Sequence, residues 1–379
     1  MRSSPVPVLL VDHAPVAGGV EMMIRDLLTA LDPARVAPTV ITDPDSPMRG
    51  RFSRVYPEVA LPLTRLKRNP AAGLSLISSA WQLARVARGA PGSVIQTFTA
   101  RTHLIGALAG LLARRPVVWR LNDDTLPPRL ARVFGRAPRR IIAVSEHLRR
   151  FYRGALTVSD IIPDGLPLPA PADSAAARAR LLLPPDALVV ALVARLVRWK
   201  GQPVFLRALA QLAQHHPNLR GLIVGGWSES EDVAGPLGGG EPYRQELLAL
   251  RDELGLTETV VFTGHQDAPL PVFAAADIVA HTSVLPEPFG RVIVEAMAAG
   301  RPVVAARAGG AEEIVLDGVT GLLTPTGDVA ALAAALGRLA ADPALRARMG
   351  AAGRARAAQE YSLARMAERF TRVWEAVAA

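Results

Sequence analysis

Two glutamates, Glu287 and Glu295, stand eight positions apart around a predicted helix start, a spacing that suits a hydroxylated ligand. A Pro-Phe-Gly turn over 288–290 precedes apolar residues at helical spacing, and Gly300 with Pro302 ends the helix. Free backbone N–H groups at such a helix start attract an anion. The carboxylates can therefore flank a bound phosphate and accept hydrogen bonds from hydroxyls on either side. A sugar nucleotide has this layout of sugar, diphosphate and ribose.

The alternative interpretation is that both glutamates are ordinary solvated residues, because two Glu at this spacing also occur by chance. The sequence that follows favours the functional interpretation. Residues 300–306 read as a helix stop leading into a buried strand, and 308–313 as a glycine turn opening another helix. Here the chain resembles the retaining glycosyltransferases of family four. Their E-x7-E element matches Glu287 and Glu295, and the resemblance is strongest over about residues 185–375.

The resemblance implies the GT-B architecture, an α/β fold in which two Rossmann-like, doubly wound domains face each other across a cleft. It also implies roles for the residues of the motif. Glu287 would hold the hydroxyls of the donor sugar, and Glu295 the ribose diol. The turn residues Phe289, Gly290 and Arg291 would lie at the donor, with backbone N–H groups near the last two stabilising the charge that grows on the diphosphate.

A basic pair, Arg195 and Lys200, follows the first predicted strand of the second half, with Gly201 closing the loop. An Arg fork binds phosphate oxygens in pairs and Lys supplies a compact charge, so the pair can neutralise a leaving nucleoside diphosphate without a metal. In the resembling family, residues at these positions act on the donor diphosphate. We assign Arg195, Lys200 and Glu287 to catalysis. Arg198 competes for one of the basic roles, and plain surface basicity is the alternative.

Gly18 and Gly19 follow the first strand of the chain and precede a helix. Glycines allow the backbone to approach a phosphate, and the helix adds its dipole. As pure structure, the two glycines form a tight turn. Resemblance to the family's N-terminal loop favours contact with the donor diphosphate. The spacing is not that of a dinucleotide-binding fingerprint.

The acceptor side departs from the family pattern. Relatives commonly carry a histidine near the end of the fourth strand, and Asn122 stands there in this chain. Asn122 can hydrogen-bond a sugar hydroxyl but cannot act as a base. His103, which follows the third strand, is the other acceptor-side candidate, although a lone His is more often structural. His265 follows a strand at the end where the nucleotide base is expected, and we place it with the donor.

Short apolar strands alternate with helical stretches along the whole chain, which predicts doubly wound α/β domains. Four prolines within 163–171 indicate a linker. We expect an N-terminal acceptor-side domain over 1–168 and a C-terminal donor domain over 169–364, with helix 365–379 packing on the first domain as in the resembling family. The expected strands cover 8–11, 36–42, 94–97, 117–120, 140–144, 188–193, 219–224, 259–262, 278–281 and 303–306.

The length of 379 residues fits two domains, and half of the residues are apolar. Residues 1–170 hold 23 Lys and Arg against 12 Asp and Glu, whereas 171–379 hold 20 against 22. Basic clusters such as 65–68, 136–140 and 149–153 favour an anionic partner, either a membrane surface or a phosphate-linked acceptor, and the alternative is Arg-rich, solvated faces. They lack interleaved aromatics, so we expect no nucleic acid partner. There is no cysteine, and we expect no metal and no cofactor beyond the donor.

These features predict a retaining, metal-independent hexosyltransferase that moves a sugar from a nucleotide-diphosphate sugar to the hydroxyl of a glycan, a lipid-linked or a small-molecule acceptor. Cell-envelope or exopolysaccharide synthesis is the expected setting. The N-terminus lacks a signal-peptide pattern, so we expect a cytoplasmic protein that contacts the inner face of the membrane through its basic first half. The alternatives are a sugar-nucleotide hydrolase or epimerase of the same fold, or a weakly catalytic module that binds sugar nucleotides.

Overall fold

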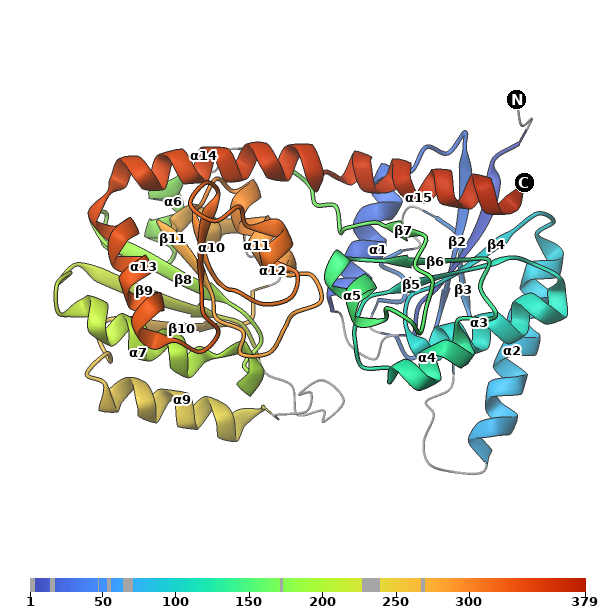
Figure 1. Ribbon diagram of the computed structural model, residues 1–379, viewed down its shortest axis with the longest axis horizontal. Helices are drawn as coiled ribbons and strands as arrows, with labels where there is room; N and C mark the ends of the chain where they lie inside the picture. The colour runs from blue at the N-terminus through green and yellow to red at the C-terminus, as the bar shows by residue number, and fades with distance from the viewer. Residues whose placement is uncertain are drawn as a thin grey trace. The chain divides into compact units, whose positions relative to one another are not determined.

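The computed structural model describes residues 4–13, 18–46, 48–52, 56–63, 71–170, 173–226, 239–266 and 270–379. The chain divides into two compact units (Figure 1). Unit 1 contains Met1–Pro167 and Tyr361–Ala379, and unit 2 contains Leu168–Glu360. The basic run at 65–68 and the last proline of the predicted linker lie outside the described residues.

Unit 1 is built on a parallel sheet of seven strands in the order β3-β2-β1-β4-β5-β6-β7. Helices from the crossovers cover the sheet (Figure 1). The strands expected from the sequence are all present, and the short edge strands β3 and β7 are additional. The elements are β1 (Val6–Val11), α1 (Gly19–Ala30), β2 (Val36–Thr42), β3 (Glu58–Ala60), α2 (Ala71–Gly89), β4 (Val94–Thr97), α3 (Ala100–Ala113), β5 (Val117–Leu121), α4 (Pro128–Phe134), β6 (Arg140–Ala143), α5 (Glu146–Phe151) and β7 (Asp160–Ile161).

The last helix of the chain, α15 (Leu363–Ala378), packs in unit 1 although it follows unit 2 in sequence. Its apolar face carries Phe370 and Trp374, which are fully buried with residues of β1, β2 and α1. The indole of Trp374 also donates a hydrogen bond of 2.9 Å to Gln96 Oε1 on β4. Burying two large aromatic side chains contributes about 2–3 kcal/mol each relative to exposure, so α15 is an integral part of the core of unit 1.

Unit 2 contains a parallel sheet of six strands in the order β10-β9-β8-β11-β12-β13. This is the doubly wound order, in which the sequence of strands is built outward first on one side of β8 and then, from β11, on the other. Its elements are α6 (Ser174–Arg180), β8 (Leu188–Val193), η1 (Arg198–Lys200), α7 (Gln202–Ala213), β9 (Leu219–Val224), α9 (Glu241–Glu253), β10 (Val260–Gly264), α10 (Leu270–Ala275), β11 (Ile278–His281), α11 (Arg291–Ala298), β12 (Val303–Ala306), α12 (Ala311–Ile314), β13 (Gly321–Thr324), α13 (Val329–Ala341) and α14 (Pro343–Glu360).

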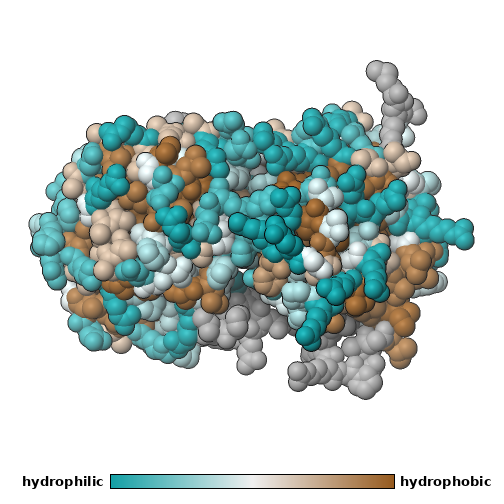
Figure 2. Space-filling view, viewed as in Figure 1, coloured by the Kyte–Doolittle hydropathy of each residue, from teal (hydrophilic) through white to brown (hydrophobic). Residues whose placement is uncertain are grey.

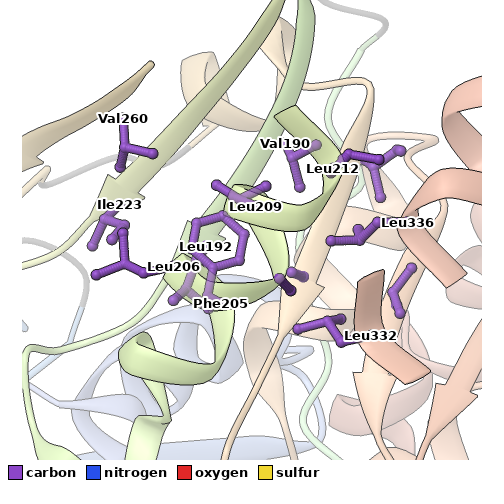
Figure 3. Packing of buried hydrophobic residues seen from close by; sticks show 14 of the residues in the cluster. Val190, Leu192, Phe205, Leu206, Leu209, Leu212, Ile223, Val260, Leu332 and Leu336 are labelled. Atoms are coloured by element: carbon purple, nitrogen blue, oxygen red, sulfur yellow. The ribbon is translucent and has the colours of Figure 1, made fainter. Parts of the chain in front are cut away.

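The core of unit 2 lies between its sheet and helices α7 and α13 (Figure 3). Leu192 of β8 lies next to Phe205 of α7, Val190 lies next to Leu212, and Leu332 and Leu336 come from α13. Because β8 is covered on both faces, its sequence is a continuous apolar run rather than an alternating one. This packing holds the carboxyl ends of β8 and β11, where polar residues begin, in fixed positions.

Candidate functional site

The predicted catalytic residues of unit 2 follow the carboxyl ends of two neighbouring strands. Lys200 ends η1, which lies after β8, and Glu287 lies in the loop between β11 and α11. Since β8 and β11 pair in parallel, the loops after them emerge at the same edge of the sheet. Two residues that are 87 positions apart in sequence are thereby brought into direct contact.

Glu287 is held by three side chains. Lys200 Nζ donates to Glu287 Oε1 over 2.7 Å, and His281 Nε2 lies 2.5 Å from Oε2. Ser283 donates its hydroxyl to the same Oε2 over 3.2 Å. With two acceptor sites on each carboxylate oxygen, Oε2 is saturated and Oε1 keeps one site for a ligand hydroxyl. The geometry therefore presents a fixed carboxylate with one open acceptor position.

The histidine of this cluster was not expected from the sequence, where His281 reads as the end of a buried strand. Its ring is almost fully buried, and Nδ1 has no hydrogen-bond partner among the described residues. Nε2 therefore carries a hydrogen that faces Glu287. The only signal in the sequence would have been a polar residue, His281, at the carboxyl end of a strand next to the motif.

The charges of the cluster are strongly coupled. Burial opposes ionisation of Glu287, but the contacts with Lys200 and His281 outweigh it and hold the pKa of the carboxyl well below its usual range. Burial lowers the pKa of Lys200, which Glu287 counteracts and Arg195 reinforces. The pKa of Arg195 is likewise lowered by burial and raised by Glu287. The three charged residues predicted from the sequence therefore act on one another in a single site.

Close backbone contacts fix the loops that carry this cluster. Gly201 has φ of 70°, and a Cβ atom there would lie 2.0 Å from the carbonyl oxygen of Thr282. The Thr282 hydroxyl donates back to the carbonyl of Lys200 over 2.9 Å. On the other side, a Cβ at Gly309 would lie 2.2 Å from the carbonyl oxygen of Glu287. Only glycine permits these approaches, so the sequence sets the position of both charged side chains.

Helix α11 begins directly after the turn, with Gly290 as its N-terminal cap residue and no side-chain cap. The start of a helix attracts an anion, although in α11 the N–H of Ile293 already donates to the carbonyl of Gly290 over 2.9 Å. Arg291 and Glu295, one turn apart, form an ion pair of 2.9 Å on the helix surface. Phe289 is buried and contributes to packing, so only its backbone is placed to meet a ligand. These residues lie where the sequence interpretation needs them, while their ligand contacts stay predictions.

Arg198, the competitor for a basic role, is directed elsewhere. Its guanidinium pairs with Glu246 over 2.6 Å and lies 4.7 Å from the ring centre of Tyr243, on α9. His265 is exposed and follows β10. It lies close to Gly226, which follows the neighbouring strand β9: a Cβ atom added to Gly226 would be 3.1 Å from the Cβ of His265. It therefore lies at the same carboxyl edge of the sheet as the charged cluster, as expected for a residue that borders a bound base.

The glycine loop of unit 1 already holds a carboxylate. Glu21, in the first turn of α1, accepts the backbone N–H of Gly18 over 2.7 Å, and burial raises the pKa of this carboxyl. A phosphate at the start of α1 would have to replace it. A Cβ at Gly19 would meet no atom within 4 Å, which leaves open space beside the backbone.

Asn122 takes part in a buried polar network. The guanidinium of Arg120, which is fully buried, donates to Asn122 Oδ1 and to Asp164 Oδ1, the latter over 2.7 Å. Asn122 Nδ2 donates to the carbonyl of Phe98 over 2.6 Å. The side-chain amide thus ties the ends of neighbouring strands together. Arg120 was not singled out in the sequence, because only a non-local partner distinguishes a buried arginine from a surface one.

The expectation that His103 lines the acceptor side is wrong. The side chain is fully buried and stacks on Trp119 with 4.2 Å between ring centres. Its nitrogens contact Thr97 Oγ1 at 3.2 Å and the carbonyl of Phe134 at 3.1 Å. Burial lowers its pKa to about 4. His103 is a neutral core residue, because its position on α3 faces the sheet.

Within the described ranges, no group of three or more His, Cys, Asp and Glu residues is arranged to hold a metal ion. Among the helices described, none has the length and apolar character needed to cross a membrane.

Comparisons with known proteins agree with this architecture. Residues 17–168 match the family model described as Glycosyltransferase Family 4, and residues 173–356 match Glycosyl transferases group 1. A D-inositol 3-phosphate glycosyltransferase from Saccharomonospora viridis is 36% identical over 313 residues, which is 81% of this chain and 66% of the relative. The corresponding enzyme of Streptomyces scabiei is 39% identical over 268 residues, 66% of this chain and 59% of the relative. The matches thus span two thirds or less of these curated relatives.

Solved structures extend the likeness over nearly the whole chain. HepE of Anabaena, crystallised in complex with UDP and glucose, is similar with a TM-score of 0.82 and 28% identity, covering 97% of this chain and 99% of HepE. Sucrose-phosphate synthase of Thermosynechococcus elongatus gives a TM-score of 0.80 with 26% identity, covering 98% and 99%.

Proposed function

Because the chain belongs to glycosyltransferase family 4 and has the GT-B fold, we propose that it moves a sugar from a nucleotide-diphosphate sugar to an acceptor hydroxyl with retention of configuration. The observation that carries this proposal is the charged cluster of Lys200, Glu287 and Arg195 at the carboxyl edge of the sheet of unit 2. It combines buried cations with a fixed carboxylate, which are the groups that a diphosphate-linked sugar requires.

In the proposed reaction, the acceptor oxygen attacks the anomeric carbon from the face that the diphosphate leaves. The bond between this carbon and the phosphate oxygen breaks, and the acceptor proton passes to an oxygen of the leaving diphosphate. Lys200 and Arg195 stabilise the negative charge that grows on it, together with N–H groups at the start of α11. Removing one such contact costs on the order of 3 kcal/mol, or a hundredfold in rate.

The carboxylates position the donor. Glu287 Oε1 keeps one acceptor site, which we assign to a hydroxyl of the donor sugar. Glu295 would accept the ribose diol while it stays beside Arg291. A leaving phosphate that accepts the proton itself needs no histidine base, which is consistent with Asn122 and with the buried, neutral His103. The chemistry proposed here needs neither a metal nor a further cofactor.

The substrates are proposed from the relatives. HepE was crystallised with UDP-glucose, so UDP-sugars are the first donors to test. The curated relatives are named for D-inositol 3-phosphate, which makes a phosphorylated polyol the first small-molecule acceptor. The net positive charge of residues 1–170 supports the second choice, a lipid-linked phosphate acceptor at the membrane in cell-envelope or exopolysaccharide synthesis.

The test is a thermal-shift screen against UDP-, GDP- and TDP-sugars, followed by product analysis with and without acceptor. A ligand at a hundred times its dissociation constant adds about 2.7 kcal/mol of stability, which such a screen detects. Retention of the anomeric configuration in the product, read by NMR, supports the proposal. Hydrolysis or epimerisation without acceptor would point to the alternative activities of this fold. Binding without any turnover would point to a binding module.

A further inference from the structure

Unit 1 contains a hollow of about 620 Å³ that lies away from the carboxyl edge of its sheet. It is lined by the loop that precedes β6, the loop that precedes β7 and the end of α15. Because all strands of this sheet run parallel, residues that precede strands lie at the amino edge. Nucleotide ligands of such sheets bind at the opposite, carboxyl edge, so the hollow is separate from the proposed catalytic chemistry.

Four arginines line this hollow: Arg132, Arg136, Arg139 and Arg140. Arg132 donates to the carbonyl of Gly154 over 3.0 Å and thereby joins α4 to the loop after α5. Across the described residues, the other three side chains make no ion pair and no hydrogen bond. In the view of Figure 2, hydrophilic side chains gather over α4 and α5.

A helix end explains only part of this charge. The carboxyl ends of α4 and α15 border the hollow, and cations near such ends are favourable by about 0.3–1 kcal/mol each. The contact of Arg132 with a backbone carbonyl fits that role. The side chains of Arg136, Arg139 and Arg140 contact no carbonyl of the described residues, and three like charges around one hollow repel one another. An anion with several charged oxygens would remove this repulsion, since each guanidinium fork binds phosphate oxygens in pairs.

We propose that the hollow lined by Arg132, Arg136, Arg139 and Arg140 is a second anion site, which binds a ligand that carries a phosphate or a diphosphate group. The group could belong to a free phosphorylated metabolite or to the headgroup of an anionic lipid, because the chemistry recognised by the arginines is the same. This inference does not depend on the glycosyl transfer proposed above.

The experiment is calorimetric titration of the full-length chain with inorganic pyrophosphate, in a Lys200→Ala background that weakens the proposed donor site. The variant is Arg136→Gln with Arg139→Gln, two exposed side chains in a loop. The matched control is Arg129→Gln, an exposed arginine of α4 that does not line the hollow. We expect saturable binding of one pyrophosphate, weakened about tenfold or more in the double variant and unchanged in the control.

A parallel flotation assay distinguishes the two sources of phosphate. It uses phosphatidylcholine vesicles with and without phosphatidylglycerol. If the headgroup is the ligand, only the anionic vesicles bind, the double variant releases them and pyrophosphate competes. If a free anion is the ligand, pyrophosphate binds but the vesicles do not. Absence of saturable pyrophosphate binding, or equal loss in the Arg129→Gln control, would overturn the proposal. Failure of the glycosyl-transfer assay leaves these readouts unaffected.

Discussion

The ion pair of Lys200 and Glu287 gives the sharpest prediction, because the two partners have different surroundings. Their side chains are 10% and 18% exposed and 2.7 Å apart. Removing one partner of a buried pair costs about 3–5 kcal/mol, and this partial exposure reduces the expected loss to about 2–3 kcal/mol. The single variant Lys200→Met is therefore expected to destabilise unit 2 by about that amount. It removes the cation that is hydrogen-bonded to Glu287, and Arg195 then has to balance the charge of the carboxylate.

The opposite variant, Glu287→Gln, should cost more. It leaves the buried Lys200 facing the positive charge of Arg195, which already lowers the lysine pKa. At an effective dielectric constant near 20 this repulsion adds about 1 kcal/mol or more. The double variant of Lys200 and Glu287 removes both charges, so its loss is expected to be smaller than the sum of the single losses.

The assay is scanning calorimetry of the four proteins in the double-mutant cycle, reading the transition that shifts, because two units need not unfold together. The control is Arg198→Met, which breaks an exposed pair on the same η1 segment and should change stability by less than about 1 kcal/mol. Single variants that match wild type, or a Glu287→Gln variant that is the more stable of the two, would refute this reasoning.

Three further outcomes are expected. Burial lowers the pKa of His103 from 6.5 in the unfolded chain to about 4 in the folded protein. The free energy of unfolding should therefore fall by about 3 kcal/mol as the pH is lowered from 6.5 to 4, because only the unfolded chain takes up the proton. In pH-dependent denaturation, His103→Phe should flatten this slope. Gly201→Ala should abolish donor binding or lower the free energy of unfolding by more than about 3 kcal/mol in thermal melts. The control Gly255→Ala, also at positive φ but with free space around the new Cβ, should lower it by about 1 kcal/mol. Asn122→Ala should destabilise unit 1 by about 1–3 kcal/mol in calorimetry, because it removes an acceptor from the buried Arg120; an unchanged transition would contradict the network.

The sequence was sufficient to predict the fold, because strands buried on both faces of a parallel sheet are continuous apolar runs. The run at 188–193 is an example, and its bounds agree with β8. Three edge strands escaped this logic. β3 contains only Glu58–Ala60, β7 only Asp160–Ile161 and β13 only Gly321–Thr324, so each is too short to show a clear pattern.

The candidate site was only partly predictable. Lys200 and Glu287 stand in local motifs, and the structure brings them into contact. Arg120 takes its role from Asp164, which is 44 positions away in sequence, so no local pattern records it. His281 reads only as the end of a buried strand, and its contact with Glu287 forms in the folded loop. The prediction for His103 is wrong because the sequence of α3 does not show which face of the helix is buried. The buried positions recur every three or four residues and include His103, but Leu111 and Leu112 are exposed, so the helix is apolar on more than one face.

The central claim is that the charged cluster of unit 2 binds the donor diphosphate, and nucleoside diphosphate affinity tests it most directly. Titration calorimetry would use the nucleotide that raises the melting temperature most. Lys200→Met should weaken binding at least tenfold, while Arg198→Met on the same segment should leave it unchanged. Equal affinity of the Lys200→Met variant and the wild type would contradict the account.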